Sequence, residues 1–347
     1  MSRARTLRDL AEGLNLSTAT VSRALAGDEA IAVTTRQRVT EAARSAGYVP
    51  NIAGRMLARG RSGFVGMVLP VRGPALVDSF LGEFVTGLGE GLVERGSDLI
   101  LATAAEGKSE LAVLQHLVAS GRADGVVLTR IAEADERVDY LRESRVPFVA
   151  HGRLLDDDQS YNWLDTDGAH AFRQAFEMLY ALGHRRFGLL TITEPMTFRH
   201  LRQEGLMAAI RECGDPQVTL DVVTAPRFDQ PARQAAVARL LADGSRPTAI
   251  LALFDELALT VMEAAMRAGL TIPGDLSVIG FDNVPAAAYA PPGLTTFDAE
   301  IRKAAREIGH LLVDTIESSD APPARRLMCP RLVARGSHGA APATTGG

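Results

Sequence analysis

The spacing of apolar and polar residues changes near residue 64 and divides the chain into two kinds of structure. In the first 47 residues, apolar side chains recur every three or four positions, which is typical of short amphipathic helices. Capping boxes at Thr6–Asp9 and Thr34–Gln37 predict the starts of two helices, and Ser17 can cap another helix between them. Gly47 is placed to end the last helix. Three helices of this size predict a minimal helix-turn-helix module.

From Phe64 onward the pattern becomes short, nearly continuous apolar runs separated by amphipathic helices. Such runs are typical of parallel strands covered on both faces, and this many of them imply two sheets. We therefore expect a small all-α head followed by an α/β core of two doubly wound parallel-sheet subdomains. The predicted strands are 65–69, 98–103, 125–129, 147–150, 187–192, 218–223, 249–253 and 277–281.

Changes of pattern also predict where the domains begin and end. The linker after the third helix contains Pro50 and Gly54, and a helix of about nine residues there would be marginal alone in water. The final ten residues are small and polar, so we expect them to be disordered. The predicted domains are a helix-turn-helix domain at 1–49, a hinge helix and linker at 50–62, a core at 63–337 and a tail at 338–347. Within the core, we expect one subdomain at about 63–161 with 292–320 and another at about 162–291 with 321–337.

The composition limits the classes of protein to which the chain can belong. Of 347 residues, 46% are hydrophobic and 23% are charged, which is close to the soluble globular average and unlike a disordered chain. No apolar run reaches the roughly 18 residues of a membrane span, and Arg3, Arg5 and Arg8 stand where a signal peptide has its apolar region. We therefore expect a cytoplasmic protein. Cys213 and Cys329 lack the spacing of a disulfide framework or a zinc site.

The net charge of −5 is distributed unevenly along the chain. Residues 1–62 contain ten arginines and five acidic residues, whereas the rest of the chain carries a net charge of −10. A basic end on an acidic body is typical of a protein that binds a polyanion with one part only. The alternative from charge alone is a solvated helical face.

Motifs for an enzyme or a metal site are weak. The stretch Gly87–Gly91 is rich in glycine, but its spacing differs from that of a dinucleotide loop and it falls inside a predicted amphipathic helix. The seven histidines form no HxxxH or HxH pair, and no GxSxG nucleophile motif occurs. The acidic run Asp156–Asp158 lacks the ligand spacing of a cation site. We therefore expect no catalytic residues, no metal and no cofactor.

Long stretches of the chain resemble one family of bacterial transcription regulators. TLRDLAEGLNLSTATVSRAL and TTRQRVTEAARSAGYVPNIAGRMLARG are similar to the DNA-binding head and hinge of the lac-repressor (LacI/GalR) family. GHRRFGLLT, RQEGLMAAI, PTAILALFDELAL and DLSVIGFDNVPAAAYAPPGLTTF resemble that family's effector-binding core, which has the periplasmic sugar-binding fold. The resemblance implies a homodimeric repressor of carbohydrate uptake or catabolism genes, which binds a pseudo-palindromic operator in double-stranded DNA and is released by a sugar effector.

Other functions stay open at this point. The same fold would also suit a non-sugar effector or a corepressor. A solute-binding protein shares the core fold, but the basic three-helix head and the missing signal peptide oppose it. An enzyme built on the α/β core would need a nucleophile, base or cofactor motif, and we find none.

The first turns of the second helix in a helix-turn-helix module face base edges in the major groove. In this chain they present Thr18, Ala19, Ser22 and Arg23. Threonine can donate or accept a hydrogen bond, and alanine can touch a thymine methyl group. Arg23 has the fork that pairs with guanine O6 and N7, and the alternative is that it binds only phosphate.

The resemblance also implies that the hinge folds on the operator and inserts a leucine from each subunit into the minor groove. Leu57 matches this wedge, beside Met56, and the alternative is that Leu57 packs between subunits. The DNA contacts implied in all are Thr6, Ser17, Thr18, Ala19, Thr20, Ser22, Arg23, Asn51 and Leu57.

Ligands of open α/β sheets bind beyond the carboxyl ends of the strands. Carboxylates and guanidinium groups there can hydrogen-bond paired hydroxyls, and aromatic faces can pack on the C–H groups of a sugar ring. Arg202 and Asp282 match effector contacts of the resembling family, whereas Phe254 replaces a polar residue that some members use. Trp163 either stacks on a ligand or has a core or interface role. The predicted effector contacts are Phe80, Arg153, Trp163, Arg202, Phe254, Asp255 and Asp282.

Overall fold

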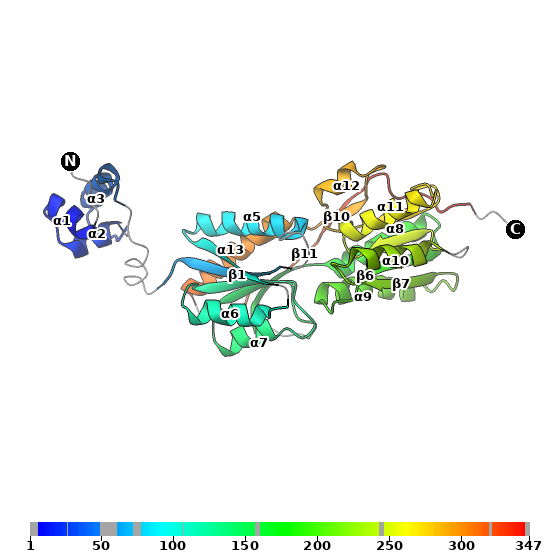
Figure 1. The fold of residues 1–347 in the computed structure, drawn as a ribbon, viewed down its shortest axis with the longest axis horizontal. Coiled ribbons are helices and arrows are strands. Elements are labelled where there is room, and N and C mark those ends of the chain that lie inside the picture. Colours follow the sequence, from blue (N-terminus) through cyan, green and yellow to red (C-terminus); the bar gives the residue numbers. More distant parts are fainter. Residues whose placement is uncertain are drawn as a thin grey trace. The chain divides into compact units, whose positions relative to one another are not determined.

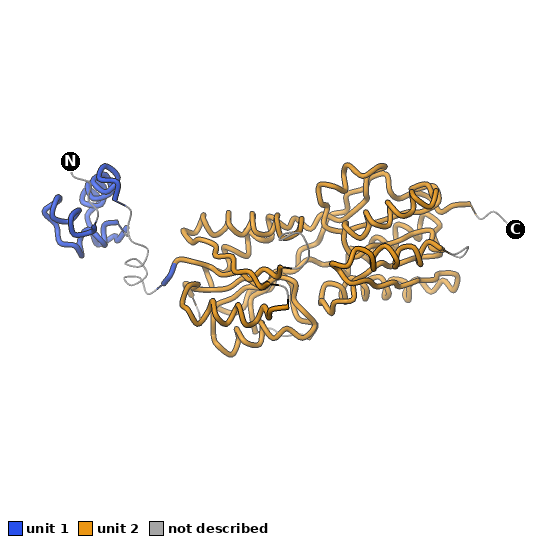
Figure 2. Tube along the Cα trace, viewed as in Figure 1, with its two compact units in different colours: residues 1–62 blue, residues 63–347 orange. Residues whose placement is uncertain are grey.

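The computed structural model describes residues 6–25, 27–48, 61–71, 78–105, 107–156, 160–242, 246–318 and 321–343. The chain forms two compact units, residues 1–62 and residues 63–347, which Figure 2 colours separately. Within these described ranges, no helix is both long enough and apolar enough to cross a membrane.

The smaller unit is a bundle of three short helices, as predicted. They are α1 (Leu7–Leu14), α2 (Thr18–Leu25) and α3 (Val33–Ala46). The predicted cap at Thr6 is confirmed, because its hydroxyl accepts from the Asp9 amide at 3.1 Å. Ser17 caps α2 through the Thr20 amide at 3.0 Å, and Gly47 ends α3 in a left-handed conformation. The buried core consists of Leu10, Ala11, Val21, Ala24, Val39 and Ala43.

The predicted capping box at Thr34–Gln37 is wrong. α3 begins at Val33, and its N-cap is Ala32, whose side chain makes no capping bond. The amide of Thr35 donates to the Ala32 carbonyl at 2.9 Å, so Thr34 already lies within the first helical turn.

The larger unit contains two parallel sheets, and the first has six strands. Its elements are β1 (Phe64–Pro70), α5 (Ser79–Glu94), β2 (Asp98–Ala104), α6 (Glu110–Ala119), β3 (Gly125–Thr129), α7 (Glu136–Glu143), β4 (Phe148–His151), β5 (Asn162–Thr166), α13 (Ile301–Glu317) and β11 (Arg325–Met328). The strand order is β11-β5-β4-β3-β1-β2, and every neighbouring pair is parallel. Figure 1 shows α5 and α13 on one face of this sheet and α6 and α7 on the other. Met67 of β1 packs into the core beside α5, whereas Val68 packs into the core beside α6.

The second sheet has four parallel strands in the order β7-β6-β8-β9. Its elements are α8 (Gly168–Ala181), β6 (Arg186–Ile192), α9 (Thr197–Cys213), β7 (Thr219–Ala225), α10 (Gln230–Leu241), β8 (Ala249–Ala252), α11 (Asp255–Arg267), β9 (Ser277–Ile279) and α12 (Pro285–Tyr289). Leu189 of β6 faces the core with α8 and α9, whereas Leu190 faces the core with α10 and α11. A short antiparallel pair, β10 (Thr296–Asp298) and β12 (Arg331–Val333), completes the unit.

All eight predicted strands are confirmed, with ends shifted by no more than two residues. The predicted subdomain limits need correction, because residues 162–166 and 325–328 were assigned to the second subdomain. These residues form β5 and β11, which pair with each other and add to the first sheet beside β4. Their sequences, NWLDT and RRLM, are too polar to form the continuous apolar run that identified the other strands.

The predicted disordered tail from residue 338 is wrong for its first part. The amide of Gly339 donates to the Ser277 hydroxyl at 3.0 Å, and the amide of Ala341 donates to the Leu182 carbonyl at 2.9 Å. These backbone hydrogen bonds hold residues 338–341 against the second subdomain. Small polar side chains do not reveal such contacts, because the bonds use the backbone of the tail.

Candidate functional site

The exposed side of α2 carries the residues predicted to read bases. Thr18, Ala19 and Arg23 are exposed and Ser22 is half-buried, because the opposite side of the helix packs into the three-helix core. One face therefore offers hydroxyl groups, a methyl group and a guanidinium group. These are the groups that distinguish base pairs in the major groove.

Arg23 is held by an ion pair with Asp28. Its Nε donates to Asp28 Oδ2 at 2.7 Å, and this hydrogen bond holds the pKa of Asp28 below its usual range. The bond uses Nε and not the terminal nitrogens that match guanine O6 and N7. Asp28 can therefore orient the guanidinium group without occupying the atoms needed for a base.

Other predicted DNA contacts take part in helix caps. The Thr6 amide donates to the Asp9 carboxylate at 3.1 Å, which completes the capping box of α1. The hydroxyls of Ser17 and Thr20 lie 2.8 Å apart at the start of α2. Their contacts with DNA stay predictions, and two further predicted contacts, Asn51 and Leu57, lie outside the described residues.

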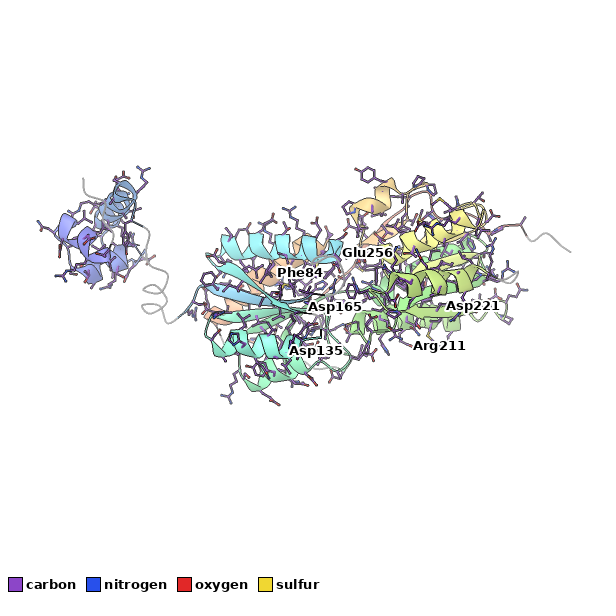
Figure 3. All side chains as sticks on the ribbon, in the orientation of Figure 1. Phe84, Asp135, Asp165, Arg211, Asp221 and Glu256 are labelled. Atoms are coloured by element: carbon purple, nitrogen blue, oxygen red, sulfur yellow. The ribbon has the colours of Figure 1, made fainter. Side chains whose placement is uncertain are left out.

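A cavity in the larger unit lies where strands of both sheets end. Four of the predicted effector contacts line it, namely Phe80, Arg202, Phe254 and Asp282. Phe80 belongs to α5 of the first subdomain, Arg202 belongs to α9 of the second, and Phe254 and Asp282 follow strands β8 and β9 of the second. Figure 3 labels a further lining residue, Asp165, at the end of β5. The structure thus brings together residues that are about 200 positions apart in the sequence, as expected for open α/β sheets.

Arg202 and Asp282 form the charged centre of this cavity. Arg202 Nη2 lies 4.0 Å from Asp282 Oδ1, and the guanidinium carbon lies 3.6 Å from the centroid of the Phe281 ring. Burial lowers the pKa of Arg202 to about 10 and raises the pKa of Asp282 to about 6. A separation of 4.0 Å is too long for a hydrogen bond, so both groups keep capacity to bond a ligand.

Asp255 lies behind the cavity and not in its wall. Its carboxylate is fully buried, accepts from the Val284 amide at 2.9 Å and accepts from the Thr296 hydroxyl. Burial raises the pKa of Asp255 to about 8. These bonds fix the loop that carries Asp282, which has a left-handed φ of 108°. Asp255 does not line the cavity in this arrangement, and its direct contact with an effector stays a prediction.

Arg153 and Trp163 also lie outside the cavity wall. Arg153 Nε donates to Asp165 Oδ2 at 3.2 Å, and its guanidinium carbon lies 5.5 Å from the centroid of the Trp163 ring. Of these three residues, only Asp165 lines the cavity. Trp163 packs against the core beneath α6 and α7, which fits the core role, and stacking on a ligand stays a prediction.

Two arginines that we did not predict line the cavity. Arg130 follows β3 and Arg227 follows β7, and both form ion pairs with Asp78, the N-cap of α5. The distance from Arg227 Nη2 to Asp78 Oδ2 is 3.1 Å. Because Asp78 belongs to the first subdomain and Arg227 to the second, this pair joins the two. Each arginine comes soon after an apolar strand, in VVLTR and VVTAPR, which is the signal that could have identified it.

The cavity is small in this arrangement, with a volume of about 60 Å³. A neighbouring cavity of about 350 Å³ shares Arg130, Phe198 and Arg227 with it, and another of about 510 Å³ shares Phe80 and Asp282. Pockets for small molecules usually measure about 300–1,000 Å³. A ring-sized ligand therefore needs the lining side chains or the two subdomains to move apart.

The chain is similar to known proteins along its whole length. Residues 6–51 match the model described as "Bacterial regulatory proteins, lacI family", and residues 176–338 match the "Periplasmic binding protein-like domain". The HTH-type transcriptional regulator AglR of Rhizobium meliloti (strain 1021) is 35% identical over 97% of this chain and 95% of its own. The HTH-type transcriptional repressor CytR of Escherichia coli (strain K12) is 30% identical over 98% of both chains.

A solved structure agrees with these relatives. The transcriptional regulator CelR in complex with cellobiose has a TM-score of 0.72 and 28% sequence identity, and the match covers 96% of this chain and 99% of that chain. The similarity therefore includes the three-helix head as well as the two-sheet core. The chain belongs to the lacI family of bacterial regulatory proteins and is a DNA-binding transcriptional regulator.

Proposed function

We propose that this protein is a cytoplasmic, homodimeric repressor of genes for carbohydrate uptake or catabolism, and that a small sugar in the cavity controls its binding to operator DNA. The observation that carries the proposal is the buried pair of Arg202 and Asp282, which lies beside aromatic rings where both sheets end. The solved structure of CelR with cellobiose supports a sugar as the ligand class. Two helix-turn-helix domains that bind the half-sites of a pseudo-palindromic operator require twofold symmetry, which favours a dimer.

The cavity offers the groups that bind the hydroxyls and the C–H faces of a neutral sugar. Guanidinium groups donate to hydroxyl and ring oxygens, carboxylates accept from hydroxyls, and phenyl rings pack on C–H groups. Arg130 and Arg227 already share the Asp78 carboxylate, and Arg202 faces Asp282. Each of the three arginines therefore has a carboxylate partner within the protein, but Arg130 and Arg227 share one, so these pairs leave one positive charge over.

The position of the cavity also suits a regulatory ligand. An effector shifts a protein between two states only through its different affinity for them, commonly by about 1–3 kcal/mol. Phe80 and Asp165 belong to the first subdomain, whereas Arg202 and Asp282 belong to the second. A ligand that contacts all four binds one arrangement of the subdomains better than others.

The first experiment is a thermal-shift screen of the full-length protein against mono- and disaccharides. A ligand at 100 times its dissociation constant adds about 2.7 kcal/mol of apparent stability, which a melting curve resolves. We expect at least one sugar to raise the melting temperature and to release operator DNA in a gel shift. Nucleosides and amino acids serve as comparison ligands, and stabilisation by one of these alone would contradict a sugar effector.

The second experiment tests the cavity with Arg202→Ala. We expect this variant to lose sugar binding in calorimetry and to stay on the operator when sugar is added, because the guanidinium group at the cavity centre is gone. Its operator affinity without sugar should be unchanged, since Arg202 lies outside the unit that carries α2. Arg211→Ala is the matched control, because Arg211 is on the same helix and its side chain is 60% exposed. A variant Arg202→Ala that is still released at the wild-type sugar concentration would show that the cavity is not the effector site.

A further inference from the structure

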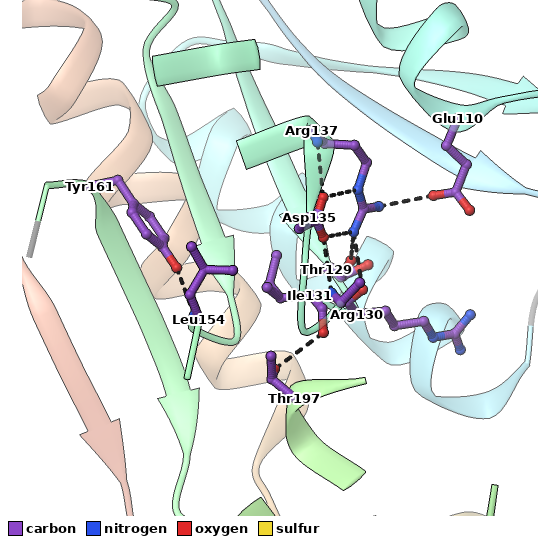
Figure 4. Close-up of polar contacts among 10 residues, drawn as sticks. Glu110, Thr129, Arg130, Ile131, Asp135, Arg137, Leu154, Tyr161 and Thr197 are labelled. Carbon is purple, nitrogen blue, oxygen red and sulfur yellow. Dashed lines mark hydrogen bonds and ion pairs between the residues drawn. The ribbon is translucent and has the colours of Figure 1, made fainter. Parts of the chain in front are cut away.

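Arg137, near the start of α7, makes an unusually complete set of bonds although it does not line the effector cavity. Its Nε and Nη2 donate to the two oxygens of Asp135, at 2.9 and 2.6 Å, and its Nη1 donates to Glu110 at 2.9 Å. Nη2 also donates to the carbonyls of Thr129 and Arg130, at 3.1 and 3.0 Å. Figure 4 shows the guanidinium group enclosed by these partners. The side chain is only 13% exposed, so the network is shielded from solvent.

These bonds fix the backbone where β3 ends. Arg130 has a left-handed φ of 53°, a conformation that side chains other than glycine rarely adopt. The Arg137 guanidinium group donates to the carbonyls of Thr129 and Arg130, while Asp135 accepts from the Ala132 amide at 3.0 Å. The turn is thus held on both sides of Arg130. Only a planar group with several donors can bond two carbonyls and two carboxylates at once.

The same turn carries the contacts that join the two subdomains. The carbonyl of Ile131 accepts from the Thr197 amide at 3.0 Å and from the Thr197 hydroxyl at 3.2 Å. Ala132 and Met196 form an isolated antiparallel bridge, and the Glu133 amide donates to the Pro195 carbonyl at 2.9 Å. We call the contacts between residues 131–133 and 195–197 the cross-subdomain bridge.

The side chain of Arg130 takes part in a second contact between the two subdomains. Its guanidinium group pairs with Asp78, which also pairs with Arg227 of the second subdomain. Arg130, Ile131 and Thr197 all line the effector cavity. A shift of this turn would therefore change the cavity wall, the cross-subdomain bridge and the ion pairs at Asp78 together.

We propose that Arg137 is a positioning residue for effector binding. Through its bonds to Asp135 and to the carbonyls of residues 129 and 130, it holds the turn that contains Arg130. This turn in turn keeps the cross-subdomain bridge and the Arg130 side chain in place. Arg137 does not line the effector cavity, although it lines the neighbouring cavity of about 350 Å³. The effect of Arg137 on effector binding rests on the proposed function of the cavity. Its effect on the cross-subdomain bridge does not depend on that function.

The test compares Arg137→Lys with the unaltered protein. Lysine keeps the positive charge but lacks the planar fork, so it cannot make the full set of bonds. Arg142→Lys is the matched control, because Arg142 is on the same helix and its side chain is 40% exposed. Asp135→Asn is a second variant, which keeps the size of the side chain but weakens its bonds to Arg137.

The first measurement is amide hydrogen exchange of the sugar-free, full-length protein. In Arg137→Lys we expect the Thr197 and Glu133 amides to lose protection, while amides within β1 and β6 keep theirs. A residue that only stabilised the fold would lower protection throughout the unit. Unchanged protection at Thr197 and Glu133, or a uniform loss in both sheets, would overturn the proposal.

The second measurement is calorimetry with cellobiose, together with a gel shift on operator DNA. We expect Arg137→Lys to bind the sugar roughly three- to thirtyfold more weakly, the usual range for residues that act through a network. Operator affinity without sugar should stay within about twofold of the control Arg142→Lys. Equal sugar affinity in both variants would contradict the positioning role. If the unaltered protein binds no cellobiose, the proposed ligand is at fault, and hydrogen exchange alone decides the role of Arg137.

Discussion

The guanidinium group of Arg23 is oriented before DNA arrives, because Asp28 holds its Nε at 2.7 Å. An arginine restrained in this way loses less side-chain freedom on binding a base than a free one. Its terminal nitrogens match guanine O6 and N7, and a bidentate pair of this kind contributes about 1–3 kcal/mol of discrimination.

We therefore expect Arg23→Ala to weaken specific operator binding by about 1–3 kcal/mol and to relax the preference at one base pair of each half-site. Gel shifts on operators with single base changes measure this effect. Arg44→Ala is the control, because Arg44 is an exposed arginine of α3 that pairs with Glu41. An equal loss of affinity for every sequence would instead assign Arg23 to a phosphate.

Asp255 gives a prediction about the pH dependence of stability. Burial raises its pKa to about 8 from the ordinary value of 3.8, so the folded protein keeps a proton that the unfolded chain has released. The free energy of unfolding should therefore fall as the pH rises from about 4 to about 8, by at most about 1.4 kcal/mol per pH unit from this group, and the effect should stop above that range.

The variant Asp255→Asn removes this titration, since the amide resembles the protonated carboxyl in shape and charge. Urea unfolding of both proteins at pH 5, 6, 7 and 8 measures the difference. We expect the unfolding free energy of the unaltered protein to fall more steeply with pH than that of the variant. Parallel curves would mean that Asp255 is ionised throughout this range.

Site residues that belong to a sequence motif are easier to predict than site residues whose role depends on contacts with distant parts of the chain. Arg202 and Asp282 were predicted because they occur in motifs of a known family and follow strands. Arg153 also follows a strand, yet its side chain bonds Asp165 and does not itself line the cavity. Arg227 was missed because its role depends on Asp78, a residue 149 positions away in the other subdomain.

At the scale of elements, buried parallel strands were predictable because both of their faces need apolar side chains. β5 and β11 were not predictable in this way, since they are short and polar and lie at one end of the first sheet. The glycines of α5 show a similar limit. The sequence excluded a nucleotide loop at Gly87–Gly91, but it did not indicate why a helix would contain three glycines within these five residues.

The structure explains two of these glycines by the close approach of α5 and α13. A Cβ atom on Gly87 would lie 2.0 Å from the Arg302 carbonyl oxygen, and one on Gly91 would lie 2.3 Å from the Arg306 carbonyl oxygen. An added Cβ on Gly89, between them, would meet no atom of another element within 4 Å. The helices can pack at this distance only if the residues between them lack side chains.

We expect Gly91→Ala to destabilise the protein by about 1–3 kcal/mol or more, because the helix backbones must separate to admit the methyl group. Gly89→Ala is a matched control with the same chemical change in the same helix, and it should stabilise by up to about 1 kcal/mol. Chemical denaturation of the two variants gives both values. A similar change in stability for both would mean that α5 and α13 do not pack as closely as the structure has them.

At the scale of the whole molecule, charge separates the two tasks of the protein. Residues 1–62 carry ten arginines against five acids, whereas the larger unit is net negative. Binding of a cationic surface to DNA releases counterions, so affinity depends steeply on salt, whereas a neutral sugar releases none. The two binding reactions of one protein should therefore respond differently to ionic strength.

We expect operator affinity to fall by roughly 10³- to 10⁵-fold between 50 and 200 mM salt if six to ten arginines of a dimer contact phosphate. Over the same range, the dissociation constant of the sugar should change by less than about twofold, because the charged groups of the cavity are buried and already paired within the protein. Gel shifts and calorimetry on the same preparation measure both, and the sugar titration controls for loss of active protein at high salt.

A flat response of operator binding would show that the basic unit is not the DNA-binding surface. A steep response of sugar binding would instead indicate a charged effector, which contradicts the neutral ligand proposed for the cavity.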